Sequence, residues 1–251
     1  VLEYFLPVQM CHMRVNEKYR VWHGACHMDD AQMAPAHNHI DGYDQKEGIS
    51  KYKPGEIVEG VNIGGWHDAG DFDLRIESQA GECYILALAY EAFHPELDVT
   101  SIDQINRITE IHQADGKNDL LQQVENGALS VVNSYLALGR LYRGIICNGL
   151  RQYVLLGDAS AMTDGKIGND DDRWIFTEDN PMREMSTAAQ LAATSRVLKG
   201  FNDTLSIHCL NIAREIFEHT GKDNPRIAFA KIQAAVELYL TTQEQPYLDY
   251  L

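Results

Sequence analysis

From Ser78 to its end, the chain is a succession of segments in which apolar residues recur at helical spacing. These segments cover residues 82–93, 118–138, 186–199, 203–219 and 225–240. Asn118 suits a helix N-cap, and Pro225 is tolerated in a first helical turn. No run of alternating apolar and polar residues is long enough to indicate a sheet. The pattern therefore predicts an all-α fold of antiparallel helical hairpins over residues 78–251, preceded by a loop-rich segment over residues 1–77.

The charge of the chain limits its partners. The 37 acidic and 21 basic residues give a formal net charge of −16, with no basic stripe to offset it. Such a field repels nucleic acid and anionic lipid, and no apolar run of membrane-spanning length is present. We therefore expect no nucleic-acid or membrane partner and favour a neutral or cationic substrate.

The segment 62–73, NIGGWHDAGDFD, concentrates chemically useful residues in one loop. Its glycines permit backbone conformations that other residues avoid. Asp68 and Asp71 lie three residues apart, so they are expected to point to one side and to activate a water molecule together. Trp66 offers a flat apolar face for a sugar ring. The residues alone, however, favour an Asp/Gly turn that binds calcium or caps a helix.

A resemblance to a known family favours the catalytic interpretation of this loop over a calcium-binding or helix-capping turn. The string GGWHDAGDFD closely resembles the signature of glycoside hydrolase family 9. Four further blocks resemble the same family and follow its order: HGACHMDDA at 23–31, DLLQQV at 119–124, STAAQLAATSR at 186–196 and AAVELYLTTQEQPYL at 234–248. The first of these is similar to the bacterial, zinc-containing branch that carries an immunoglobulin-like domain. Five ordered blocks make the resemblance specific, which a lone DAGD would not.

The resemblance implies an (α/α)6 toroid, of which residues 1–251 would be the N-terminal part, and hydrolysis of β-1,4-linked glucosyl-type saccharides with inversion. It makes Asp71 the general base and Asp68 a second acceptor for the nucleophilic water. The family's general acid, a glutamate beside an asparagine, has no match here, and neither Glu178 nor Glu184 is assigned that role. We therefore expect the remainder of the same domain to be a partner of this chain. The alternative is a saccharide-binding remnant that does not cleave.

The cysteines and histidines form a second candidate site. Thiolate and imidazole are the usual ligands of structural zinc, taken four at a time. Spacing alone leaves several histidines in competition, including His12 and His23. The resemblance implies that the ligands are Cys11, Cys26, His27 and His67. Four such ligands leave no open position, which argues against a hydrolase in which zinc activates water.

The substrate pocket and a second ion complete the expectations. A long insert separates His27 from Trp66, and it has room to close one end of a cleft. This favours exo-β-glucosidase or exo-β-glucosaminidase action on short oligosaccharides, with an endo-β-1,4-glucanase as the alternative. His37 and His39, within the insert, are candidates to line the pocket. The acidic run at 170–172 is either a solvated loop or a calcium site, and Asp170, Asp171 and Asp172 supply the hard oxygen ligands that calcium prefers.

Overall fold

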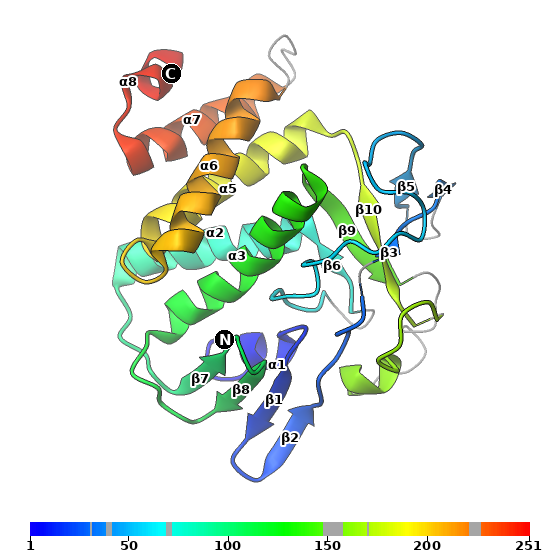
Figure 1. Cartoon of the computed structure of the whole chain (residues 1–251). Coiled ribbons are helices and arrows are strands. Elements are labelled where there is room, and N and C mark those ends of the chain that lie inside the picture. The colour runs from blue at the N-terminus through cyan, green and yellow to red at the C-terminus, as the bar shows by residue number, and fades with distance from the viewer. Residues whose placement is uncertain (31, 39–41, 69–71, 148–157, 170, 221–226) are drawn as a thin grey trace.

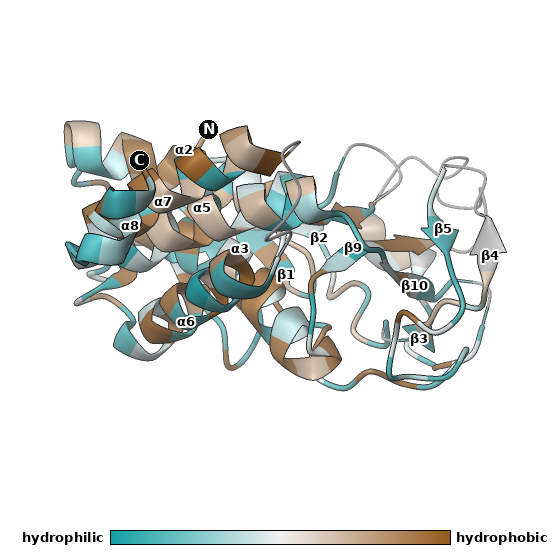
Figure 2. Ribbon diagram, turned by 90° about the horizontal axis from the view of Figure 1, so that it is seen from above, coloured by the Kyte–Doolittle hydropathy of each residue, from teal (hydrophilic) through white to brown (hydrophobic). Residues whose placement is uncertain are grey.

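The computed structural model describes residues 1–30, 32–38, 42–68, 72–147, 158–169, 171–220 and 227–251. The larger helices gather at one end of the molecule, and strands and loops make up the other end (Figures 1 and 2). No helix within these residues combines the length and the apolar character that crossing a membrane requires.

The helices confirm most of the helical pattern in the sequence. Their bounds are α1 Phe5–Gln9, α2 Ile76–Phe93, α3 Asp119–Leu138, a 3-10 turn Ala159–Met162, α5 Pro181–Leu198, α6 Asp203–His219, α7 Ala228–Thr242 and α8 Gln245–Tyr250. The Asn118 side chain caps α3 by accepting from the backbone N–H groups of Leu120 and Leu121, and Gly139 ends this helix in the left-handed conformation. Helix α5 packs against α2, α6 and α7, and α2 also packs against α3.

Short strands make the all-α prediction only partly correct. They are β1 Arg14–Glu17, β2 Arg20–His23, β3 Gln32–Met33, β4 His37–Asn38, β5 Asp44–Gln45, β6 Leu74–Arg75, β7 Thr100–Asp103, β8 Ile108–Ile111, β9 Tyr142–Cys147 and β10 Arg173–Thr177. They form sheets in the orders β2-β1-β8-β7 and β3-β10-β9-β6, with a β4-β5 hairpin. The strands are two to six residues long, too short for their alternation to stand out in the sequence. The β1–β2 and β7–β8 pairings are local, but the pairings β1–β8, β3–β10, β9–β10 and β6–β9 join segments far apart in the chain, which local propensity does not show.

The central sheet carries the candidate site. Strand β10 pairs with β9 in antiparallel fashion and with β3 in parallel, which brings residues 32–33 beside residues 174–175. Strand β6 lies on the other side of β9 and leads directly into α2. Beneath these elements, α3 is buried along most of its length, including several polar residues. Of the segment before β6, Gly65 and Trp66 bond to α3, and the Phe72 carbonyl accepts from Arg173 at the start of β10.

Candidate active site and metal centre

The two glycines before Trp66 attach the loop to helix α3. Gly64 and Gly65 have φ angles of +66° and +87°, which L side chains rarely adopt. The Gly65 N–H donates to the Asn126 carbonyl at 3.0 Å, and the Asn126 side-chain amide donates back to the Gly65 carbonyl at 3.0 Å. A Cβ atom on Gly64 would lie 2.2 Å from the Asn126 carbonyl oxygen. The approach of the loop to the helix therefore requires glycine.

Trp66 is a structural residue, and its prediction as a sugar-stacking platform is wrong. Its side chain is only 2% exposed. The indole N–H donates to Gln123 Oε1 at 2.8 Å, and a Cβ on Gly127 would lie 2.3 Å from the ring. Gln79 accepts from the Trp66 N–H and donates to its carbonyl, both at 2.8 Å. The ring has no free face for a ligand, and the sequence could not reveal this because Gly127 lies on a different element.

Asp68 lies at the accessible edge of the same loop. Its side chain is 31% exposed, and its Oδ2 lies 3.0 Å from Nε of Arg75. The Asp68 N–H donates to the carbonyl of Asp73 at 2.8 Å, which draws the two ends of the DAGD turn together. A small pocket beside Asp68 is lined by Phe5, Leu6, Gln9, Trp66, His67 and Glu82. Asp71 falls outside the described residues, so its predicted role stays a prediction.

The four predicted metal ligands lie together. One ligand atom from each of Cys11, Cys26, His27 and His67 falls within 4.8 Å of all the others, and all four residues are buried. Cys11 Sγ is 3.7 Å from His27 Nδ1, and Cys26 Sγ is 3.5 Å from His67 Nε2. Burial lowers the pKa of His67 to about 4, so its imidazole is neutral at physiological pH and free to bind a cation. The donor set therefore suits a metal ion.

A fully buried arginine stabilises this cluster. Arg173 is 0% exposed and forms an ion pair with the equally buried Asp30. Its Nη2 donates to Cys11 Sγ at 3.1 Å. Burial raises the pKa of the Cys11 thiol, but hydrogen bonding from Cys26 and the positive charge of Arg173 hold it well below its ordinary value. The arginine therefore favours the thiolate form that binds metals.

His12 and His23, the competing histidines, lie next to the cluster but not in it. Burial would lower the pKa of His12, but the Cys11 thiolate and Asp30 raise it to about 9. A protonated His12 has no lone pair for a metal; its Nδ1–H donates to the Gly64 carbonyl at 2.9 Å. His23 lies with its ring 5.7 Å from that of His67. His39 lies outside the described residues, as does the side chain of His37.

Phe72 connects the metal cluster to the DAGD turn. Phe72, which follows Asp71 in sequence, has a φ of +59° although it is not glycine. Its ring centroid lies 4.9 Å from that of His67 and 6.0 Å from that of His27. Its carbonyl accepts a hydrogen bond from Arg173. The backbone beside Asp71 is therefore fixed both by the two histidines and by the arginine.

A second group of candidate ligands lies next to Asp30 and Arg173 in the sequence. Asp29, Asp171 and Asp172 are buried and bring carboxylate oxygens within 4.8 Å of one another; Asp170 lies outside the described residues. Burial and the neighbouring carboxylates raise the pKa of Asp172 to about 6. Asp29 Oδ2 and Asp172 Oδ1 are buried without a hydrogen-bond partner in the described part of the chain. Asp171 and Asp172 are thus buried rather than solvated, and Asp29 was not anticipated as their partner.

Arg173 and Asp30 are the residues that sequence reasoning missed. Asp30 lies in the HGACHMDDA block, and Arg173 directly follows the acidic run. The two are 143 residues apart, so neither has a local signal of the contact. An arginine after three aspartates is typical of a solvated charge. It is buried here because β10 pairs with β9, where Arg173 lies opposite Cys147, and with β3.

The chain belongs to glycosyl hydrolase family 9, because the sequence model of that family matches residues 3–251. A search of curated protein sequences found no match. Among solved structures, the chain resembles a metagenome-derived family 9 endoglucanase, with 20% identity and a TM-score of 0.69 over 98% of this chain and 42% of that one. A zinc-binding triple mutant of the family 9 endoglucanase J30 gives 18% identity and a TM-score of 0.70, covering 98% and 45%.

A third structure is the cellulase Cel9M of C. cellulolyticum in complex with cellobiose, at 18% identity and a TM-score of 0.60. The match covers 99% of this chain and 51% of that enzyme. At these identities the resemblance shows the fold alone. The chain spans about half the length, or less, of the solved structures that it matches.

Proposed function

We propose that this chain contributes the water-activating half of a glycoside hydrolase that cleaves β-1,4-linked glucosyl-type saccharides with inversion. Family membership supports the reaction class. The observation that carries this proposed function is the difference in exposure between Asp68 and the residues around it. Asp68 is partly exposed, whereas Trp66, Phe72 and Asp73 around it are buried and held in place. Such a rigid setting for an accessible carboxylate suits the orientation of a water molecule.

Within this proposal Asp71 is the general base, and Asp68 accepts a second hydrogen bond from the same water. An inverting hydrolase also needs a carboxylic acid on the other side of the scissile bond. Glu178 and Glu184 pair with Arg183 and Arg140, respectively, and neither is assigned that role. We place the helical hairpins in the (α/α)6 toroid that the family implies, with His37 and His39 beside the substrate.

We also propose that Cys11, Cys26, His27 and His67 bind one zinc ion. The buried set of two sulfur and two nitrogen donors matches a closed structural site. Bound there, the ion would have a structural effect: it would hold His27 and His67 against Phe72 and so fix the turn that carries the base. For Asp29, Asp171 and Asp172 we propose a calcium ion, because three buried carboxylates need a compensating cation.

The experiment that tests the function is hydrolysis of cellopentaose by the intact enzyme and by its Asp71→Asn and Asp68→Asn variants. We expect the Asp71 variant to lose nearly all turnover while it retains saccharide binding, and the Asp68 variant to lose a smaller part. Normal turnover in Asp71→Asn would place the base elsewhere. Binding without hydrolysis by the unmodified protein would indicate the non-catalytic alternative.

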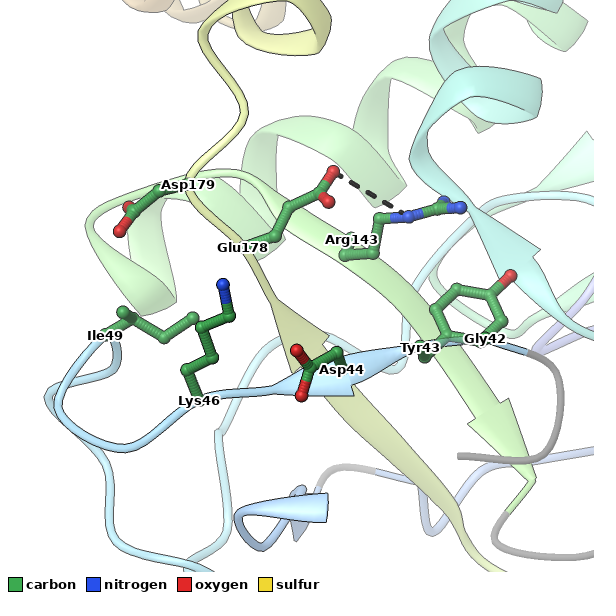
Figure 3. A pocket seen from close by; sticks show the side chains of 8 residues that line it. All are labelled: Gly42, Tyr43, Asp44, Lys46, Ile49, Arg143, Glu178 and Asp179. Carbon is green, nitrogen blue, oxygen red and sulfur yellow. Dashed lines mark ion pairs between the residues drawn. The ribbon is translucent and has the colours of Figure 1, made fainter. Parts of the chain in front are cut away.

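The mode of cleavage is the finer part of the proposal. Exo action is supported by the insert, whose strand β5 and the residues beside it wall one side of a pocket (Figure 3). The endo alternative is supported by the relatives, since the metagenome-derived enzyme and J30 are endoglucanases by name. Early products from cellopentaose distinguish them: glucose first indicates exo action, and mid-length fragments without glucose indicate endo action.

A further inference from the structure

A polar pocket lies between the insert and strands β9 and β10. It encloses about 580 Å³ of space, part of it open to solvent. One wall comes from the insert, with Asp44 and Lys46, and the opposite wall from β9 and the end of β10, with Arg143, Glu178 and Asp179. Figure 3 shows the Lys46 side chain extending from β5 toward the segment that carries Glu178 and Asp179.

The far wall is held by ion pairs. Arg143 lies 2.7 Å from Glu77 Oε2 and 3.7 Å from Glu178 Oε1. Arg183 pairs with Glu178 and with Glu77, and Arg140 pairs with Asp179. These charges compensate one another, so the wall offers fixed polar atoms without a large surplus of either sign. A network of this kind is rigid enough to hold hydrogen-bonding groups for a ligand.

The wall formed by the insert differs, because its charged side chains have no polar partner in the described part of the chain. Among the described residues, the side chains of Asp44 and Lys46 take part in no ion pair and no hydrogen bond. One is an acceptor and the other a donor, and both line the pocket. A ligand that bonds to both needs a donor and an acceptor but no net charge. Neighbouring hydroxyl groups of a sugar meet this requirement.

The pocket is connected to the DAGD turn through stacked side chains. The Arg75 guanidinium that pairs with Asp68 lies 5.9 Å from the centre of the Tyr43 ring. Arg143, which lines the pocket, lies 4.7 Å from the same ring. Tyr43 itself is 2% exposed and lines the pocket floor. One layer of side chains thus separates the pocket from Asp68, which places it within reach of an oligosaccharide bound at the turn.

We propose that this pocket is a remote subsite that binds a neutral sugar unit of the oligosaccharide, with Asp44 and Lys46 as its specificity-determining residues. The proposal rests on the proposed function, because it assumes that the chain bound at the turn is a saccharide. It goes beyond that function by naming where a distal unit binds and by favouring a neutral glucosyl unit over glucosamine.

The test uses the intact enzyme with Asp44→Asn and Lys46→Met, measured for binding by calorimetry and for turnover with cellopentaose. Each substitution removes a charged hydrogen-bonding group, so we expect each to weaken binding about tenfold, with the change in KM larger than that in kcat. Matched controls are Glu59→Gln and Lys53→Met, exposed residues of the same insert that lie outside the pocket. The controls should match the unmodified enzyme.

Whether each substitution weakens or strengthens saccharide binding indicates the charge of the bound sugar unit. Weaker binding in both variants supports a neutral sugar. The same binding measurement with the cationic pentasaccharide of glucosamine gives the opposing outcome. If Lys46→Met binds it more tightly and Asp44→Asn more weakly, while neither variant changes cellopentaose binding, the unit is cationic and the proposal is overturned. If turnover is normal and both variants match the controls, the subsite is wrong but the proposed function stands. If cellopentaose binds in a pocket-dependent way without being cleaved, the subsite stands and the proposed function fails.

Discussion

Replacing Arg173 by methionine tests the physical basis of the metal centre. The substitution keeps much of the side-chain volume but removes the charge that faces Asp30 and Cys11. Asp30 is 1% exposed, and its buried carboxylate would lose its guanidinium partner and keep the His12 ring, whose Nε2 lies 3.7 Å away. Breaking a buried pair in this way costs about 3–5 kcal/mol. For a chain of this size each kcal/mol corresponds to roughly 2–4 °C, so we expect the melting temperature to fall by about 6–20 °C.

Thermal unfolding followed by circular dichroism measures this loss, with Arg214→Met as the matched control. Arg214 pairs with Glu244 at the surface, where both side chains are at least one-third exposed. Solvent screening limits its contribution to about 1 kcal/mol or less. Adding Asp30→Asn to Arg173→Met should recover part of the stability, because the buried carboxylate charge that lost its guanidinium partner is then gone. A melting temperature within about 3 °C of the parent protein, or no recovery in the double variant, would refute the reasoning.

Three further predictions concern the loop and the two ion sites. Cys26→Ser should abolish stoichiometric zinc in elemental analysis, whereas Cys209→Ser, a buried thiol outside the cluster, should leave it unchanged; zinc-free parent protein would contradict this. Gly64→Ala should destabilise more than Gly60→Ala in urea titrations, because both have positive φ but only Gly64 faces a backbone oxygen at 2.2 Å; equal losses would exclude the close approach. With chelator present, the raised pKa of Asp172 should make stability fall as pH rises from about 4 to about 6, since the folded state retains a proton that the unfolded state releases. Asp172→Asn should flatten that slope, and so should calcium; an unchanged slope in both would contradict the assignment.

The fold was predictable where local signals agree. Helix α6 has the bounds that its apolar spacing indicates, and Asn202 caps it by accepting from the Leu205 N–H. Helix α2, by contrast, begins at Ile76 rather than at residue 82, because its first turn includes the buried polar residue Gln79, which bonds to the Trp66 backbone. The apolar pattern alone cannot show that a polar side chain has such a partner.

The candidate site was predictable in the parts that a motif encodes. Cys11, Cys26, His27 and His67 converge as the family resemblance implies. The burial of Trp66 depends on Gly127 and Gln123 in α3, and the contact between Arg173 and Asp30 depends on strand pairing over 143 residues. Both depend on tertiary contacts, which a linear pattern does not record. Tertiary contacts also bring Asp29 beside Asp171 and Asp172, since only the last two are neighbours in sequence.

The long separation between Arg173 and Cys11 has a consequence for how the protein folds. The contact joins residues 162 positions apart, so the chain must close a very large loop before it forms. Contacts of this kind form late, because their closure entropy is not recovered until neighbouring elements have packed. Until then, Cys11 and Cys26 are accessible thiols without the arginine that completes their site. We therefore expect refolding yields to depend on a reducing agent during folding, and much less on one added afterwards, when both sulfur atoms are buried.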